Sequence, residues 1–132
     1  RISFGTTKIN LFSVHLSTYQ DERVLAAKEM NRIIRKIDPS ELIIMGGDFN
    51  VGVTRLGKGK YTYEESESYE EYEILKKQLE KLPNEKDTWF SDLGNGCIDT
   101  IFYSKGIRLN KYETIEANGA SDHNAVFAEF DI

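Results

Sequence analysis

The spacing of apolar residues along the first third of the chain predicts two strands, a helix and a third, buried strand. Residues 1–4 and 9–16 alternate imperfectly between apolar and polar positions, which is typical of strands whose two faces are both partly buried. Residues 20–37 carry apolar side chains at steps of three and four, which predicts an amphipathic helix that stops at the Asp-Pro pair 38–39. Residues 41–45 form a short apolar run of the buried-strand type. A helix followed by a buried strand is half of a crossover unit, which indicates an α/β fold.

The remainder of the chain predicts a loop, a second helix and three more strands. Three glycines in residues 52–60 indicate a loop, and the six glutamates of residues 64–73 lead into a helix that stops at Pro83 and Asn84. The apolar side of this helix is expected to consist of Tyr69, Tyr72, Leu75, Leu79 and Leu82. The last strands are expected at residues 97–103, 108–115 and 125–132, which are rich in β-branched and aromatic residues.

Length and composition fit one small domain. The 132 residues, 39% of them hydrophobic, suffice for one modest core. The formal net charge of −5 argues against a strong, non-specific grip on nucleic acid by this chain alone, because that grip depends on clustered lysine and arginine. No apolar run approaches the ~20 residues that span a bilayer, so no membrane span is expected. The single cysteine, Cys97, excludes an intrachain disulfide, and the start at Arg1 leaves the native N-terminus and the compartment open.

Three short acidic motifs, each at the boundary of a predicted strand, carry the chemistry of the chain. They are Gly-Asp-Phe-Asn at 47–50, Ile-Asp at 98–99 and Ser-Asp-His at 121–123. One of the two histidines belongs to the last motif, and the other, His15, lies near the end of the apolar run 11–16. Carboxylates, an amide and imidazoles at strand ends are the side chains of a metal-assisted phosphate-cleaving site.

The first motif places Asp48 and Asn50 directly after a buried strand. Two glycines, Gly46 and Gly47, precede them and are expected to let the backbone turn sharply and approach a ligand. Asp48 is suited to accept a proton or to hold a metal, and Asn50 is suited to donate to a phosphoryl oxygen. The alternative is an Asx-turn that merely closes the strand.

The other motifs offer a carboxylate–histidine pair. Asp99 lies in an apolar strand, where a buried carboxylate needs a partner, and a histidine is the obvious one because a carboxylate fixes its tautomer. The alternative partner is a loop backbone. Asp122 and His123 point in different directions as neighbours, so the aspartate is suited to face a metal and the histidine a substrate. Alternatively, the motif is a Ser-Asp turn with an incidental histidine, and His15 is a satisfied core histidine.

In this order the motifs resemble those of the endonuclease/exonuclease/phosphatase superfamily, which includes the pancreatic deoxyribonuclease, apurinic endonucleases, neutral sphingomyelinases and inositol-polyphosphate 5-phosphatases. The resemblance rests on residues 14–16, 47–50, 98–102 and 121–123 and aligns the whole chain with the C-terminal half of the family's domain. It implies that residues 1–132 are the C-terminal portion of a single domain. The implied fold class is α/β, part of a deoxyribonuclease-like four-layer α/β/β/α sandwich, with this chain supplying mainly the C-terminal sheet and its helices.

The resemblance also implies a role for each site residue. Asp48 would orient or deprotonate the attacking water, and Asn50 would contact the phosphate. His123, oriented by Asp99, would contact the scissile phosphoryl oxygen, and His15 would be a second phosphate-contacting histidine. The implied cofactor is Mg²⁺ or Mn²⁺, because hard cations prefer oxygen ligands. The residues implied on the metal side are Asp48, Asn50 and Asp122.

The family's N-terminal half has no counterpart in the chain, because only 14 residues precede His15. That half supplies an early Asn, a Glu that is the principal metal ligand, and half of the sandwich. The implied reaction of the parent protein is metal-dependent phosphoester hydrolysis by in-line attack of an activated water, as a phosphodiesterase, nuclease or phosphatase. The alternative, which the missing Glu favours, is a non-catalytic interaction module that retains the fold. A generic α/β domain with coincidental motifs is a third interpretation.

Without that half, one face of the sheet is expected to be apolar and exposed until the N-terminal half or self-association covers it. The residues considered for this face or its opposite are Phe12, Val14, Ile43 and Ile101.

The substrate stays open among nucleic acid, a phospholipid headgroup and an inositol phosphate, and loops 51–68 and 84–96 are expected to select it. The glutamates of 64–73 form either a cation site or, as their position favours, a solvated helix start, and they mildly disfavour nucleic acid at that edge. Three basic residues of the first loop either meet phosphate or are merely solvated. They are Arg55, Lys58 and Lys60.

Overall fold

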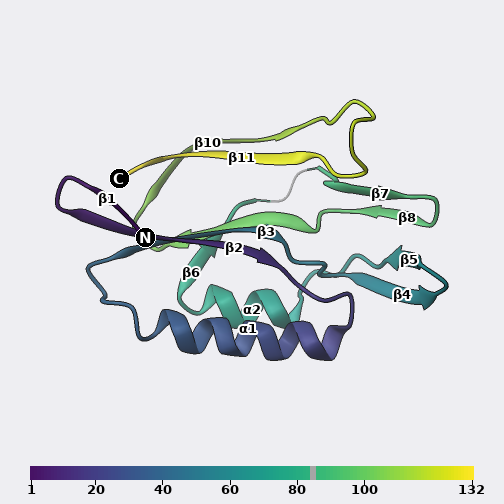
Figure 1. The fold of residues 1–132 in the computed structure, drawn as a ribbon, viewed down its shortest axis with the longest axis horizontal. Coiled ribbons are helices and arrows are strands. Elements are labelled where there is room, and N and C mark those ends of the chain that lie inside the picture. The colour runs from purple at the N-terminus through teal and green to yellow at the C-terminus, as the bar shows by residue number, and fades with distance from the viewer. Residues whose placement is uncertain (84–85) are drawn as a thin grey trace.

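The computed structural model describes residues 1–83 and 86–132, in which a five-stranded mixed sheet lies between two helices and a β-hairpin (Figure 1). Only the second and third strands of this sheet are parallel, and all its other neighbours are antiparallel. In spatial order the strands are β1 (Ile2–Phe4), β2 (Thr7–His15), β3 (Leu42–Asp48), β9 (Asp99–Ser104) and β6 (Leu79–Lys81). The chain is therefore a mixed α/β structure, as predicted.

Helix α1 (Gln20–Ile34) connects the two parallel strands and packs beside α2 (Glu70–Lys76) on one face of the sheet (Figure 1). Three antiparallel hairpins complete the described fold. They are β4 (Val53–Gly57) with β5 (Lys60–Tyr63), β7 (Trp89–Ser91) with β8 (Gly94–Gly96), and β10 (Arg108–Ile115) with β11 (Ala125–Asp131). No helix among the described residues has the length and apolar character that crossing a membrane requires.

Each face of the sheet has its own apolar cluster. On the helix side, Met45, Phe49 and Phe102 are almost completely buried beneath α1 and α2. On the other side, Tyr103 packs against Phe130 of the β10–β11 hairpin, with the ring centroids 4.9 Å apart. The central strand β3 is thus covered on both faces, which explains why it is apolar on both sides.

A buried ion pair joins the two helices to the backbone near the ends of the strands. Arg23 of α1 donates from Nε to Oε1 of Glu71 in α2 at 2.9 Å, and both side chains are almost inaccessible. Nη1 of Arg23 also donates to the carbonyls of Ser17 and Val53, at 3.4 and 3.2 Å. One guanidinium therefore fixes α2, the segment after β2 and the start of β4. The acidic run does begin a helix, but Glu71 is a buried partner of Arg23 rather than a solvated residue.

Gly47 lets β2 and β3 pair closely near their C-terminal ends. It lies opposite Val14 in the parallel register and adopts φ +147°, in the region that favours glycine. A Cβ at this position would come 2.0 Å from the Val14 carbonyl oxygen, so no other residue fits without moving the strand. The expected sharp turn at Gly46 and Gly47 is therefore wrong, since both stay in β3. The close approach that Gly47 permits is to the backbone of β2, and the expected approach to a ligand stays a prediction.

Two predicted elements differ from the structure. Residues 52–60 are not a loop, because β4 and β5 pair through a turn in which Gly57, Lys58 and Gly59 have positive φ angles. The second helix ends at Lys76 rather than near 82, because Leu79 continues into edge strand β6 against β9. Leu79 and Leu82 are buried as expected, but in an extended segment. The stop expected at Pro83 and Asn84 lies partly outside the described residues, as do the first two residues of loop 84–96.

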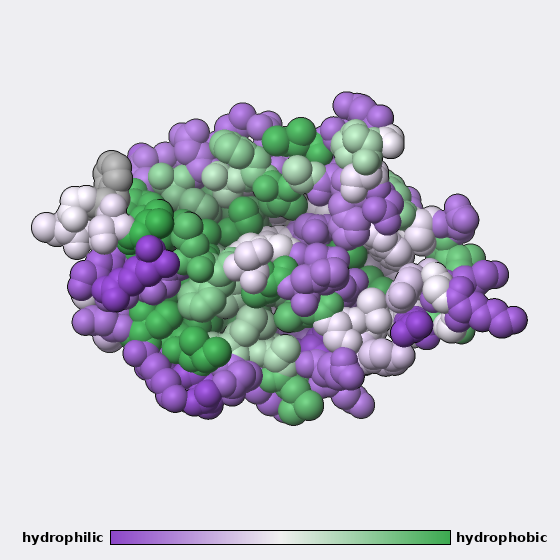
Figure 2. Space-filling model, in the orientation of Figure 1, coloured by the Kyte–Doolittle hydropathy of each residue, from purple (hydrophilic) through white to green (hydrophobic). Residues whose placement is uncertain are grey.

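The sheet face expected to be bare is covered over β3 and β9, but over β2 it stays exposed from Leu11 onward. Phe12, Val14 and Ile43 pack in the helix-side cluster, whereas Ile101 packs in the cluster beneath β10 and β11. The C-terminal hairpin forms a layer of its own, which the strand pattern did not predict. Figure 2 nevertheless shows hydrophobic surface on the viewer's side, where β1 and β2 form the sheet edge. Two large apolar side chains on these strands, Ile2 and Leu11, are about half exposed (49% and 51%).

We expect Gly47→Ala to destabilise the fold by about 2 kcal/mol or more, because an alanine there combines an unfavourable positive φ with a steric clash against β2. Chemical denaturation measures the effect. Gly106→Ala is the matched control, since Gly106 has φ +92° but an added Cβ meets nothing within 4 Å. Equal losses for the two variants would show that the close approach at Gly47 contributes nothing beyond its backbone angle.

Candidate functional site

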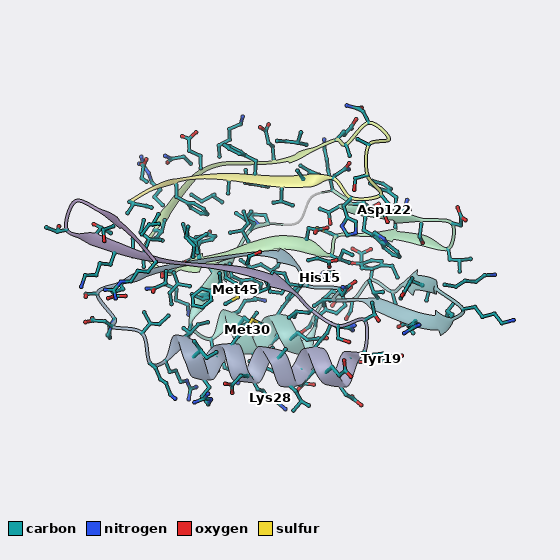
Figure 3. The ribbon with its side chains drawn as sticks, viewed as in Figure 1. His15, Tyr19, Lys28, Met30, Met45 and Asp122 are labelled. Atoms are coloured by element: carbon teal, nitrogen blue, oxygen red, sulfur yellow. The ribbon has the colours of Figure 1, made fainter. Side chains whose placement is uncertain are left out.

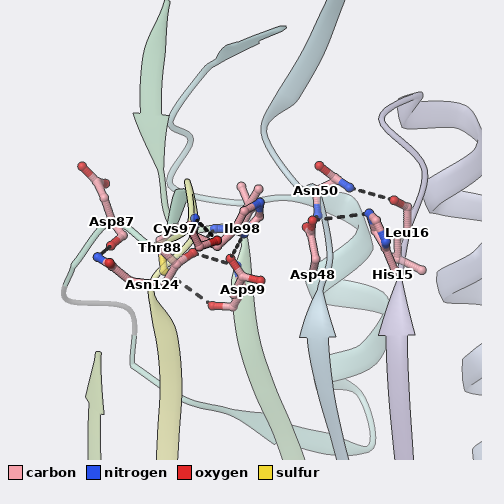
Figure 4. A network of polar contacts seen from close by, with 12 residues as sticks. His15, Leu16, Asp48, Asn50, Asp87, Thr88, Cys97, Ile98, Asp99 and Asn124 are labelled. Carbon is pink, nitrogen blue, oxygen red and sulfur yellow. Dashed lines mark hydrogen bonds and ion pairs between the residues drawn. The ribbon is translucent and has the colours of Figure 1, made fainter. Parts of the chain in front are cut away.

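The sheet aligns three predicted site residues in one row. His15 is the last residue of β2, Asp48 is the last of β3, and Asp99 is the first of β9. His15 pairs with Asp48 in the parallel register, and Asp48 pairs with Asp99 in the antiparallel one. Side chains at paired positions point to the same face of a sheet, so the three lie side by side where these strands end or begin (Figure 4).

Asp48 and Asn50 form a tight turn directly after β3. Oδ1 of Asp48 accepts a hydrogen bond from the backbone N–H of Asn50 at 2.8 Å, which is an Asx-turn. Asn50 has φ +50° and donates from Nδ2 to the Leu16 carbonyl at 2.8 Å, which ties the end of β3 to the end of β2. Figure 4 shows the amide oxygen of Asn50 directed away from Leu16. The Asx-turn and the functional interpretation are therefore compatible, because the turn itself orients both side chains.

His123 is held by Asp99, as the sequence predicted. Nδ1 of His123 lies 2.9 Å from Oδ2 of Asp99, and both side chains are mostly buried. This contact leaves Nε2 as the ring nitrogen that can face a substrate. The second histidine differs, because the His15 side chain is 77% exposed and its Nε2 lies 3.5 Å from Oδ2 of Asp48. His15 is therefore not a core histidine.

The β7–β8 hairpin and the segment before it attach His123 to the sheet. Trp89 forms an isolated antiparallel bridge with His123, and the N–H of Phe90 donates to the Asp122 carbonyl at 3.0 Å. The buried Thr88 hydroxyl accepts from the backbone N–H groups of Ile98 and Asp99, at 3.0 and 2.9 Å. Thr88 therefore positions both sides of the Asp99–His123 pair.

Thr88 and Asn124 are residues of this network that the sequence did not reveal. The Asn124 N–H donates to the Thr88 carbonyl at 2.7 Å, and its side chain contacts the backbone of Ala117 and Asp87 (Figure 4). Asn124 directly follows the Ser-Asp-His motif, and this adjacency was the one available signal. No sequence signal pointed to Thr88, because it contacts backbone groups of residues that are distant from it in the sequence.

Asp48, Asp99 and His123 are close enough to share one ion. Their nearest ligand atoms all lie within 4.8 Å of one another. Burial raises the pKa of Asp48 above its ordinary value, and the neighbouring Asp99 carboxylate raises it further, although the hydrogen bond from Asn50 and the two histidines act in the opposite direction. A hard divalent cation would stabilise the Asp48 carboxylate, whose charge is disfavoured by burial and by the neighbouring Asp99, so this site fits Mg²⁺ or Mn²⁺.

Asp122 lies apart from this three-residue group. Its side chain is exposed in the bend before β11, and Figure 3 shows it above and to the right of His15. Its position is compatible with a ligand that approaches from solvent. Its part in metal binding stays a prediction, as does that of Asn50.

Comparison with known proteins identifies relatives of this arrangement. A sequence model described as endonuclease–reverse transcriptase matches residues 9–127, which is most of the chain. No curated protein matches the sequence. Among solved structures, a humanized TDP2 from D. rerio superposes with a TM-score of 0.69 at 15% identity, over 98% of this chain and 58% of that one.

Two bacterial structures show the same fold. An endonuclease/exonuclease/phosphatase family protein from Leptotrichia buccalis has a TM-score of 0.62 at 20% identity and is covered over 52% of its length by 99% of this chain. A mannosyl-6-phosphatase from Bacteroides thetaiotaomicron has a TM-score of 0.56 at 20% identity, with 92% and 51% covered. At these identities the likeness concerns the fold alone. The chain spans about half the length of the structures it matches.

We expect Asp99→Asn to lower the pKa of Asp48, because the substitution removes a neighbouring negative charge while leaving Asp48 buried. Carboxyl ¹³C NMR titration of Asp48 measures the change. Glu29→Gln is the control, since Glu29 lies on the exposed side of α1 and does not act on Asp48. An unchanged or higher Asp48 pKa in Asp99→Asn would mean that the two carboxylates do not interact.

Proposed function

Because the chain belongs to the endonuclease/exonuclease/phosphatase superfamily, we propose that it supplies about half of the active site of a metal-dependent phosphoester hydrolase. The observation that carries the proposal is the convergence of Asp48, Asp99 and His123 within 4.8 Å, at the end of β3, the start of β9 and just before β11. Such a cluster joins a proton acceptor, an oriented imidazole and a place for a cation, which are the parts that phosphoester cleavage by water requires.

Asp48 is the proposed base in this reaction. Its carboxylate is partly desolvated and held by the Asn50 N–H, so the oxygen that faces His15 is placed to accept a proton from an attacking water. Burial and Asp99 both make Asp48 a better proton acceptor than an ordinary aspartate. The Asn50 side chain, fixed by its bond to Leu16, is proposed to contact a phosphoryl oxygen beside it.

His123 and His15 are the proposed contacts of the phosphoryl group. The Asp99 carboxylate is placed to accept from Nδ1–H of His123 and so to fix the ring, which leaves Nε2 to meet a phosphoryl oxygen as negative charge develops there. His15 is exposed beside Asp48, and we propose that it meets a second oxygen.

The proposed cation is Mg²⁺ or Mn²⁺, with Asp48, Asn50 and Asp122 on its side of the site. When bound, it would offset the charge on the phosphoryl oxygens during in-line attack. Asp99 is the less suitable ligand of the clustered carboxylates, because His123 already occupies one of its oxygens. Asp48 is therefore the best-placed protein ligand in the described part of the chain. One such carboxylate is a small number of protein ligands for Mg²⁺, even when water molecules complete its coordination shell.

We infer that residues outside this chain complete the site. The chain spans about half of the structures that it matches, and its sheet edge at β1 and β2 carries exposed apolar side chains. An N-terminal half could both add a carboxylate ligand for the cation and cover the exposed edge of the sheet. The alternative is a second copy of this chain. The substrate is a phosphoester. The matched family's description favours a phosphodiester of nucleic acid over a phospholipid headgroup or an inositol phosphate.

We expect the 132-residue chain alone to hydrolyse bis-p-nitrophenyl phosphate feebly with Mg²⁺ or Mn²⁺, and the full product of its reading frame to do so robustly. In that full product, Asp48→Asn and His123→Ala should each reduce kcat by about 10²–10⁴-fold, the usual contribution of a general base or acid. Glu29→Gln on exposed α1 serves as the control.

Two outcomes would contradict this function. Full turnover by the 132-residue chain as a monomer would show that its site is already complete. An inactive full product that still folds and binds Mn²⁺ would instead favour a non-catalytic interaction module with this fold.

A further inference from the structure

The β4–β5 hairpin is the one strongly basic projection beside the site in the described part of the chain. Between residues 53 and 63 it carries three cations and no acidic residue, although the chain as a whole has a formal charge of −5. The cations are Arg55, Lys58 and Lys60. All three are exposed, and within the described residues none of them is in an ion pair. The tip of the hairpin forms hydrophilic surface at the right-hand end of the molecule (Figures 1 and 2).

The hairpin is firmly attached to the site rather than loosely tethered. Val53 at its base donates to the Asn50 carbonyl at 3.1 Å and packs in a small core with Trp89 and Ile98, which neighbour His123 and Asp99. On its other side, Tyr63 packs over Gly96, where an added Cβ would lie 2.2 Å from the ring. The direction in which the hairpin projects is thus set by the same residues that position the site.

Arg55 is fixed against Tyr19, in the segment that follows β2. Its guanidinium donates to the Tyr19 hydroxyl at 3.2 Å and lies 6.0 Å from the centre of that ring, and Tyr19 is only four residues beyond His15. Tyr19 is about half exposed (52%), so a cation and an aromatic face are presented together. Cations beside exposed aromatic rings are the typical composition of surfaces that bind single-stranded nucleic acid.

The length of the hairpin determines which substrates can reach its tip. β4 extends about 13 Å from Val53 to Gly57, at about 3.3 Å per residue. Each strand of a nucleic-acid duplex carries one phosphate per about 3.4 Å of helix axis, so this distance corresponds to about four nucleotides of a base-paired strand. Lys58 and Lys60 lie beyond the end of β4, so a polynucleotide is better suited than a small ester to contact them while one of its phosphates is held at Asp48.

From this geometry we propose that the β4–β5 hairpin is a phosphate-binding arm that holds a nucleic-acid strand on one side of the scissile bond. The inference rests on the proposed function for its location but adds a binding surface outside the catalytic cluster. An anionic membrane is the less suitable ligand, because only one large apolar side chain of the hairpin, Leu56, is strongly exposed (61%), and stable interfacial binding needs a larger apolar face. The exposed glutamates at 64, 65 and 67 follow β5, at the base of the hairpin rather than at its tip.

Fluorescence anisotropy with a labelled 20-nucleotide single-stranded DNA tests the arm, with EDTA present so that no hydrolysis occurs. We expect Arg55→Ala, Lys58→Ala and Lys60→Ala combined to weaken binding more than tenfold at 50 mM salt. The slope of log K against log [salt] should fall in magnitude by about 2, from three lost contacts at about 0.7 each. Lys58→Gln with Lys60→Gln, at the tip alone, should give an intermediate loss, and circular dichroism verifies folding of both variants.

The matched control removes the same charge at the opposite end of the sheet, by Arg35→Ala, Lys36→Ala and Lys105→Ala, and should bind like the wild type. Three results would contradict the proposed phosphate-binding arm. They are equal DNA binding by the hairpin and control variants, no DNA binding by the wild type, and hairpin-dependent binding to vesicles with 30% phosphatidylserine that DNA does not displace. The proposed function fails separately, since DNA binding through the hairpin by a full product that hydrolyses no phosphoester would overturn only the catalytic assignment.

Discussion

The close pairing of β2 with β3 at Gly47 is the constraint on which the site depends. Because the Val14 carbonyl occupies the space where a Cβ of residue 47 would lie, the two strands reach their C-terminal ends in fixed register. That register places His15 beside Asp48, and the antiparallel pairing of β3 with β9 places Asp99 on the other side. A shift by one residue would move Asp48 to the opposite face, beneath the helices.

His123 is positioned by the β7–β8 hairpin and by the segments before β9 and β11. His123 reaches Asp99 because the Trp89 bridge and the Thr88 hydroxyl hold the segments before β11 and β9 together. The same small core under Trp89 fixes the base of the β4–β5 hairpin at Val53. Proton acceptor, imidazole and basic arm are therefore positioned by one continuous packing unit. Within the cluster of Asp48, Asp99 and His123, one of the two carboxylates is already bonded to His123, in keeping with a chain that spans about half of its structural relatives.

The sequence predicted what depends on local pattern and short motifs, and missed what depends on distant pairing. Strong 3.6-residue periodicity predicted α1, and the Asp99–His123 pair followed from the cost of an unpartnered carboxylate in an apolar strand. Leu79 continues a helical pattern, yet it forms a strand because the free edge of β9 is available to it. The sequence of the hairpin at 53–63 indicates a loop because glycines form its turn. The role of Thr88 depends on the meeting of three segments that are distant in sequence.

The central claim is that a divalent cation binds at the ends of these strands. Paramagnetic broadening of ¹H–¹⁵N NMR signals by substoichiometric Mn²⁺ tests it most directly, because the effect locates the ion without requiring activity. The account predicts that the amide signals of Asp48, Asn50, Asp99 and His123 broaden first, even if binding by the isolated chain is weak. Broadening that begins instead at the glutamates of residues 64–67, or that spreads evenly over the surface, would contradict it.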